Sequence, residues 1–140
     1  MKKVCSLIVT AAVAAAGSAG VAHALPPFKK AFEEKYVEPS DNDVFKDTFK
    51  KASCNACHVK GEPKDVNNVY GEALAALIVG SAKDRLAESR DNGTKDAVEA
   101  QVLKELQEAF GKAESAKADG AAESFGDLIK AGKLPGGDVE

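Results

Sequence analysis

The segment Cys54-Asn55-Ala56-Cys57-His58 carries the most specific pattern in this 140-residue chain. Two thiols three residues apart on a helix lie on roughly one face, where they can add to the two vinyl groups of one haem. The histidine that follows can reach the haem iron, and histidine is an established axial ligand of haem. The pattern C-x-x-C-H is typical of c-type haem attachment. We therefore predict one covalent haem c, bound through Cys54 and Cys57, with His58 as a ligand of its iron.

The N-terminus has the features of a secretory signal peptide. Two lysines precede an apolar, alanine-rich run at residues 4–21, and Ala22-His23-Ala24 then fits a signal-peptidase site. The run is near the lower limit for a membrane-spanning helix, about 17–25 residues. Its Ala and Gly content and the cleavage pattern favour a signal peptide over an anchor. We predict that residues 1–24 are removed, leaving one periplasmic or otherwise exported domain at 25–140, with no membrane insertion after cleavage.

Removal of this segment leaves few groups that can bind a metal. The remaining cysteines are Cys54 and Cys57, the remaining histidine is His58, and the single methionine of the chain, Met1, is lost. A structural zinc site needs four ligands, and a thioredoxin-like C-x-x-C site is expected near a βαβ pattern. A structural disulfide is a third alternative in an oxidising compartment, but it would leave His58 without a role. Covalent haem attachment is therefore the favoured interpretation.

The charge of the chain argues against two classes of partner. Without Lys2 and Lys3, 17 of the 19 Lys and Arg remain against 22 Asp and Glu, for a net charge of −5. The sequence has no basic patch of the kind that binds nucleic acid and no basic amphipathic helix suited to a membrane surface. We therefore expect partners among redox proteins, and not nucleic acids or membranes.

Apolar spacing predicts an all-α fold. No stretch alternates apolar and polar residues for long enough to indicate a strand. Expected N-caps are Ser40, Ser81 and Thr94. We expect helices at about 28–37, 43–57, 71–79, 82–90, 95–117 and 121–131, and a loop at 58–66.

The helix that leads into the cysteines should present two faces. Phe45, Phe49 and Ala52 share a stripe, whereas the two cysteines lie more than a quarter-turn away. We predict that Phe45 and Phe49 pack against the last helix, around Phe125 and Leu128. Stripes at 28/32/36 and 98/102/106/110 should add to the core.

The stretch at about 43–74 resembles the N-terminal half of class I c-type monohaem cytochromes. An aromatic-bearing helix leads into C-x-x-C-H, and Asn68-Val69-Tyr70-Gly71 is similar to the Asn-Leu-x-Gly segment of that family. The last helix resembles the C-terminal helix of the family. This resemblance implies a cytochrome c-like helical domain around one covalent haem. A four-helix class II arrangement is the alternative, but there the haem motif lies near the C-terminus.

Three features depart from the family pattern. Phe49 stands five residues before the first cysteine, where the family usually has an aromatic four before it. The helix at 28–37 is an addition. The distal methionine has no counterpart, because no methionine remains after cleavage, and we therefore expect a lower reduction potential than that of His/Met cytochromes.

These observations favour an electron carrier over an enzyme. We expect the protein to transfer single electrons between redox partners that the sequence does not identify. The alternative is a gas-binding or ligand-binding protein, or a weak peroxidase, with an open sixth iron position. Candidates for that position are Lys60, Lys64, Tyr70, the amine of Leu25 and water. Water is the favoured occupant, which predicts a high-spin ferric haem.

Overall fold

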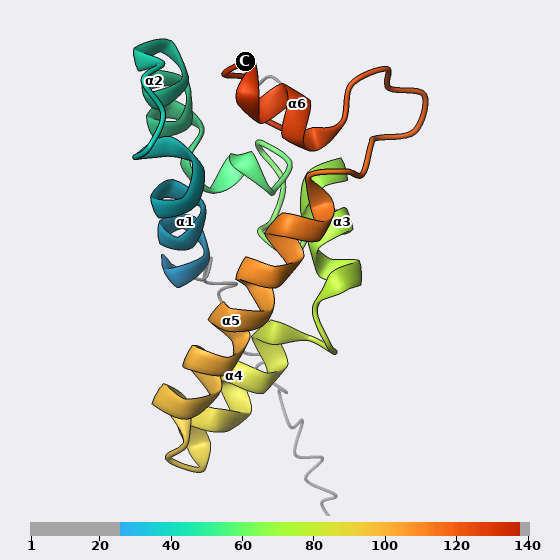
Figure 1. Cartoon of the computed structure of the whole chain (residues 1–140). Coiled ribbons are helices and arrows are strands. Elements are labelled where there is room, and N and C mark those ends of the chain that lie inside the picture. Colours follow the sequence, from blue (N-terminus) through green and yellow to red (C-terminus); the bar gives the residue numbers. More distant parts are fainter. Residues whose placement is uncertain (1–25, 138–140) are drawn as a thin grey trace, which may run out of the picture.

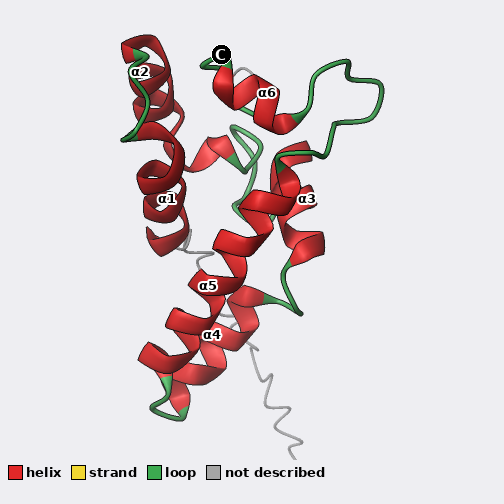
Figure 2. Ribbon diagram, viewed as in Figure 1, coloured by secondary structure: helices red, strands yellow, loops and turns green. Residues whose placement is uncertain are grey.

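The computed structural model of the chain describes residues 26–137, so the expected signal peptide at 1–24 lies outside the described residues (Figures 1 and 2). Within this range the structure is helical and contains no strand, which confirms the all-α expectation. The elements are α1 (Pro26–Phe32), a π-helical turn η1 (Glu33–Val37), α2 (Asp43–Ala52), a 3₁₀ turn η2 (Ser53–Ala56), α3 (Val69–Leu77), α4 (Ala82–Asp91), α5 (Lys95–Ala113) and α6 (Phe125–Lys130).

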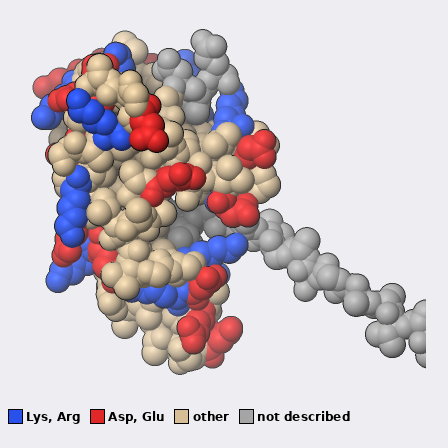
Figure 3. Space-filling view, turned by 90° about the vertical axis from the view of Figure 1, so that its right-hand side faces the viewer, with Lys and Arg blue, Asp and Glu red and all other residues tan. Residues whose placement is uncertain are grey.

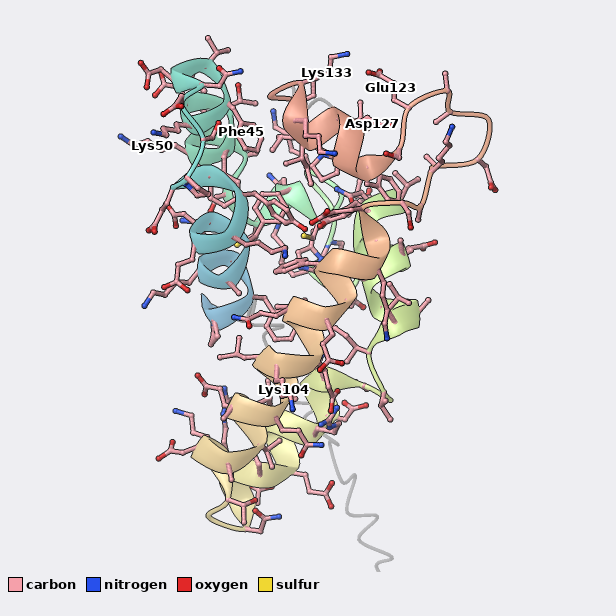
Figure 4. The ribbon with its side chains drawn as sticks, viewed as in Figure 1. Phe45, Lys50, Lys104, Glu123, Asp127 and Lys133 are labelled. Atoms are coloured by element: carbon pink, nitrogen blue, oxygen red, sulfur yellow. The ribbon has the colours of Figure 1, made fainter. Side chains whose placement is uncertain are left out.

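Helix α2 begins and ends differently from the sequence prediction. Its N-cap is Asn42, whose Oδ1 accepts a hydrogen bond from Phe45 N at 3.1 Å, and not Ser40. The predicted extension to Cys57 is wrong, because Ser53 has φ +52° and interrupts the helical backbone after Ala52. The amphipathic pattern is confirmed, since Phe45 points from α2 toward α6 whereas Lys50 points away (Figure 4).

Helices α3 and α4 both pack against α5. Ser81 caps α4 by accepting a hydrogen bond from Asp84 N at 3.2 Å, as predicted. Thr94 stands at the N-cap of α5, but its side chain makes no capping hydrogen bond there. Arg85 of α4 forms a bidentate pair with Glu105 of α5, at 2.6 and 3.0 Å.

Helix α5 ends at Ala113 and α6 begins at Phe125, so both are shorter than predicted. The chain between them folds back, with Gly126 N donating to Glu114 O at 2.9 Å. Glycine permits this approach, because a Cβ at Gly126 would lie 2.8 Å from that carbonyl oxygen. Ser124 starts α6 with a capping box that includes Asp127. Asp127, Glu123 and Lys133 lie around this helix in Figure 4, where Lys133 Nζ is 3.5 Å from Glu123 Oε2.

A cluster of aromatic rings forms the centre of the core. Phe32 of α1 stacks on Phe49 with a centroid distance of 5.3 Å and meets the edge of Tyr70 at 6.0 Å. Tyr70 in turn meets Phe125 at 5.2 Å. Phe45, Phe49 and Phe125 share one buried core cluster, against which Leu128 packs, and the aromatic pairs link Phe49 to Phe125 through Phe32 and Tyr70. Phe45 lies near the end of α6, where its Cβ is 3.5 Å from a Cβ built at Gly132.

The described surface is mixed in charge. Lys and Arg side chains alternate with Asp and Glu on the face in Figure 3, without a large area of one sign. Among residues 26–137, no helix combines the length and apolar character needed to cross a membrane.

Candidate functional site

The segment that carries Cys54, Cys57 and His58 is a tight turn. Residues Ser53–Ala56 form a 3₁₀ turn, and Cys54 O accepts hydrogen bonds at 3.2 Å from both Cys57 N and His58 N. His58 then forms an isolated antiparallel bridge with Asn67. The loop between them closes through Val59 N and Val66 O at 3.1 Å. The turn therefore fixes Cys54 and Cys57 relative to each other. The bridge to Asn67, at the far end of the loop, fixes His58.

Asn68 ties this turn to α3. Its Oδ1 accepts hydrogen bonds from Tyr70 N at 3.1 Å and Gly71 N at 3.0 Å, which caps the helix. Its Nδ2 donates to the carbonyl oxygens of Asn55 at 3.1 Å and Ala56 at 3.2 Å. Our sequence analysis did not assign Asn68 this role, although Asn directly before an apolar helix is a known N-cap pattern.

Gly71 lets α3 lie directly against the turn. A Cβ at this position would be only 2.0 Å from Cys57 O and 3.0 Å from Asn67 Cβ. The same carbonyl oxygen accepts a hydrogen bond from Asn68 N at 3.0 Å. A side chain at position 71 would hold α3 away from the turn, whereas glycine lets the two backbones touch. This contact fixes the position of Cys57.

An apolar cavity of about 420 Å³ opens beside the turn. Its volume falls within the range of ligand pockets, about 300–1,000 Å³. Cys54, Cys57 and His58 all lie on its wall. The structure therefore places the three residues predicted as a haem site together, on one cavity. The main apolar lining comes from four helices and the residue after one of them: Phe28 and Phe32 of α1, Phe49 of α2, Leu74 of α3 with its C-cap Ile78, and Leu106 and Phe110 of α5.

Burial favours the neutral forms of Cys57 and His58. Burial, with a smaller contribution from nearby Cys54, raises the pKa of Cys57 to about 12, so this side chain is a thiol at neutral pH. Burial also lowers the pKa of His58, and the charge of Lys64 adds to this effect. A neutral imidazole keeps a lone pair that can bind a metal. The buried Nδ1 of His58 has no hydrogen-bond partner in the described structure.

Three lysines reach the cavity: Lys29, Lys64 and Lys83. Of our candidates for the sixth iron position, Lys64 lines the cavity, but its Nζ donates to Asn55 Oδ1 at 2.5 Å. Lys60 does not line it. Tyr70 is buried in the aromatic core, outside the lining. The amine of Leu25 lies outside the described residues.

This geometry gives little support to a disulfide or a metal site at the two cysteines. Cys54 and Cys57 are both free thiols. Within residues 26–137, no group of three or more His, Cys, Asp or Glu side chains is arranged to hold a metal ion. Comparison with protein-family models, curated proteins and solved structures finds no match to this chain.

Proposed function

We propose that this protein is a c-type cytochrome with one covalent haem, attached through Cys54 and Cys57 and ligated by His58. The observation that carries the proposal is a complete C-x-x-C-H segment on the wall of an apolar cavity of about 420 Å³. The motif is specific for this attachment, and the cavity offers the apolar surroundings that a porphyrin ring needs. We further propose a cytochrome c-like fold, export, and electron transfer as the function.

The residues of the cavity fit the cofactor chemically. Two unpaired thiols face the same space and are available to form thioether bonds. The neutral imidazole of His58 suits ligation of iron, whose other ligands would come from the porphyrin nitrogens. Lysines at the cavity wall provide cations for the two carboxylates of haem. When bound, haem supplies an iron that exchanges single electrons.

The protein residues would hold this group and control its surroundings. Phe32, Phe110 and Leu106 are each about 1% exposed, so the cavity wall that they build excludes water. A low-polarity environment and the identity of the axial ligands are the means by which a protein adjusts a haem potential. Gly71 and Asn68 fix the attachment turn to α3, so the position of the ring would be set by the core.

A ligand-binding or weak peroxidase function is the second candidate. The specific observation in its favour is the composition of the cavity wall, which includes no methionine and no histidine besides His58. An iron position that lacks a strong protein ligand would bind carbon monoxide quickly in the reduced state. An electron carrier with both axial positions filled would bind it slowly, so the rate of carbon monoxide binding separates the two functions.

Intact mass of the exported protein tests the attachment. The full chain is expressed with a c-type maturation system, and loosely bound haem is removed by acid–acetone extraction. We expect the polypeptide of residues 25–140 plus one haem. Cys54→Ser/Cys57→Ser should give bare polypeptide, whereas Cys5→Ser, outside the motif, should leave the haem in place. Bare polypeptide from the unsubstituted chain would end the proposal.

A further inference from the structure

We infer that Lys29 is the second axial ligand of the iron, on the side away from His58; this rests on the proposed haem. Lys29 was not among the lysines that sequence alone suggested. It belongs to α1, which the resemblance to class I cytochromes does not account for. The inference gives that added helix a chemical role.

Helix α1 directs Lys29 to the cavity. Phe28, Lys29 and Phe32 form one face of α1, and all three line the cavity wall. The Lys29 side chain is partly buried, and its Nζ lies 6.0 Å from the centroid of the Phe49 ring. Phe49 also lines the cavity. The amine is therefore held beside an apolar ring at the cofactor space.

Lys29 and His58 approach the cavity from different walls. His58 is bridged to Asn67, directly before α3, and α3 packs on Cys57 through Gly71. Helix α1 packs on α2 through the stacked rings of Phe32 and Phe49, and it also touches α3 through the edge contact of Phe32 with Tyr70. In Figure 1, α1 and α3 stand on opposite sides of the segment that carries the cysteines. Lys29 and His58, which both line the cavity, would therefore both be available to hold a haem attached to the cysteines.

The other nitrogen donors on the cavity wall are less suited. Lys64 Nζ is held by Asn55 Oδ1 at 2.5 Å. The Lys83 side chain is exposed to solvent. Lys29 makes no ion pair within the described part of the chain, whereas its neighbour Lys30 pairs with Glu34 at 3.4 Å. To bind, the Lys29 ammonium would release one proton to solvent, and its nitrogen lone pair would form the bond to iron, without transfer of an electron.

Ferric electron paramagnetic resonance of the holoprotein at neutral pH tests the inference. We expect a low-spin signal from two nitrogen ligands in the wild type and in Lys30→Ala, the matched control. Lys29→Ala should lose this signal and gain a high-spin one, and added imidazole should restore low spin. Mass spectrometry of each sample establishes the attached haem, so a failure of the proposed function appears separately as missing haem.

A second variant covers the case in which Lys29→Ala is poorly folded. Lys29→Met keeps an unbranched apolar stem and offers a thioether, which raises the potential of cytochromes c. We expect it to stay low-spin with a higher reduction potential. A Lys29→Ala protein with the wild-type spin state would overturn the inference. In the Lys29→Ala protein, a changed potential with an unchanged low-spin signal would equally overturn it, because Lys29 would then pair with a haem carboxylate.

Discussion

Replacing Gly71 with alanine tests the contact that positions the attachment turn. The new Cβ would lie 2.0 Å from Cys57 O and 3.0 Å from Asn67 Cβ. A backbone oxygen cannot rotate away as a side chain can, so α3 or the turn must move. Overpacking of this kind costs about 1–3 kcal/mol, and the better helix propensity of alanine offsets about 0.5–1 kcal/mol. These figures leave a net loss of at most about 2.5 kcal/mol in the free energy of unfolding, and we expect the upper part of that range, about 1–2.5 kcal/mol, because the contact with a backbone oxygen is severe.

Gly111→Ala is the matched control for this substitution. Gly111 also lies inside a helix, α5, but a Cβ there would meet nothing within 4 Å. The same chemical change should therefore stabilise the protein, by about 0.5–1 kcal/mol. Gly71 is buried whereas Gly111 is exposed, and an added methyl group would meet other atoms only at Gly71, so opposite signs would separate packing from propensity.

Urea denaturation of the holoprotein, followed by far-ultraviolet circular dichroism, measures both variants against the wild type. If the free energy of unfolding falls with urea at the same slope in all three proteins, differences between their midpoints report differences in stability. We also expect the Gly71→Ala protein to show a disturbed haem absorption spectrum, since Cys57 must shift. If Gly71→Ala proves as stable as the wild type, or gains stability as Gly111→Ala does, the close approach of α3 to the turn is wrong.

Three further predictions concern the core, α6 and the haem. Phe49→Ala removes a ring that is 1% exposed and should cost about 3–5 kcal/mol, whereas Val44→Ala on the exposed face of α2 should leave the urea midpoint nearly unchanged. Ser124→Ala should cost about 0.5–2 kcal/mol as a lost N-cap. Hydrogen bonds from Ser124 lower the pKa of Asp127. Their stabilisation is therefore present at neutral pH and is lost as the pH falls through the folded pKa of Asp127. The urea midpoint, measured at decreasing pH, should show this loss in the wild type and less of it in Ser124→Ala. Electrochemistry should give a reduction potential below that of His/Met carriers, and a typical His/Met value would contradict the missing thioether.

Local patterns in the sequence predicted the helices well where local interactions determine them. Ser81 caps α4 because its hydroxyl needs only the amide three residues ahead. The prediction failed where distant backbone sets the boundary. Helix α6 begins late, after its N-cap Ser124, whose capping box with Asp127 we did not predict, and Phe125 N and Gly126 N are bound to the carbonyl oxygens of Ala116 and Glu114. The positive φ of Ser53 likewise has no local signal, since serine rarely adopts it.

The candidate site was only partly predictable for the same reason. Cys54, Cys57 and His58 form a contiguous motif, so their proximity follows from the chain itself. Lys29 lies 25 residues before the first cysteine, and its place on the cavity wall depends on how α1 packs against Phe49. Helical periodicity places Lys29 nearer than Lys30 to the face of Phe28 and Phe32, but it does not show that this face borders a cavity. Tyr70 was a candidate ligand by position, but α3 turns it into the core instead.

The C-terminal end of the described chain also rests on the attachment turn. A Cβ at Gly136 would lie 2.0 Å from Asn68 Nδ2, and the adjoining Leu134 and Pro135 are buried. Asn68 thus joins three segments that are remote in sequence, namely the cysteine turn, the start of α3 and this tail. We expect segments joined in this way to open together in amide hydrogen exchange. Opening of the tail would then expose the backbone around Cys57 to solvent.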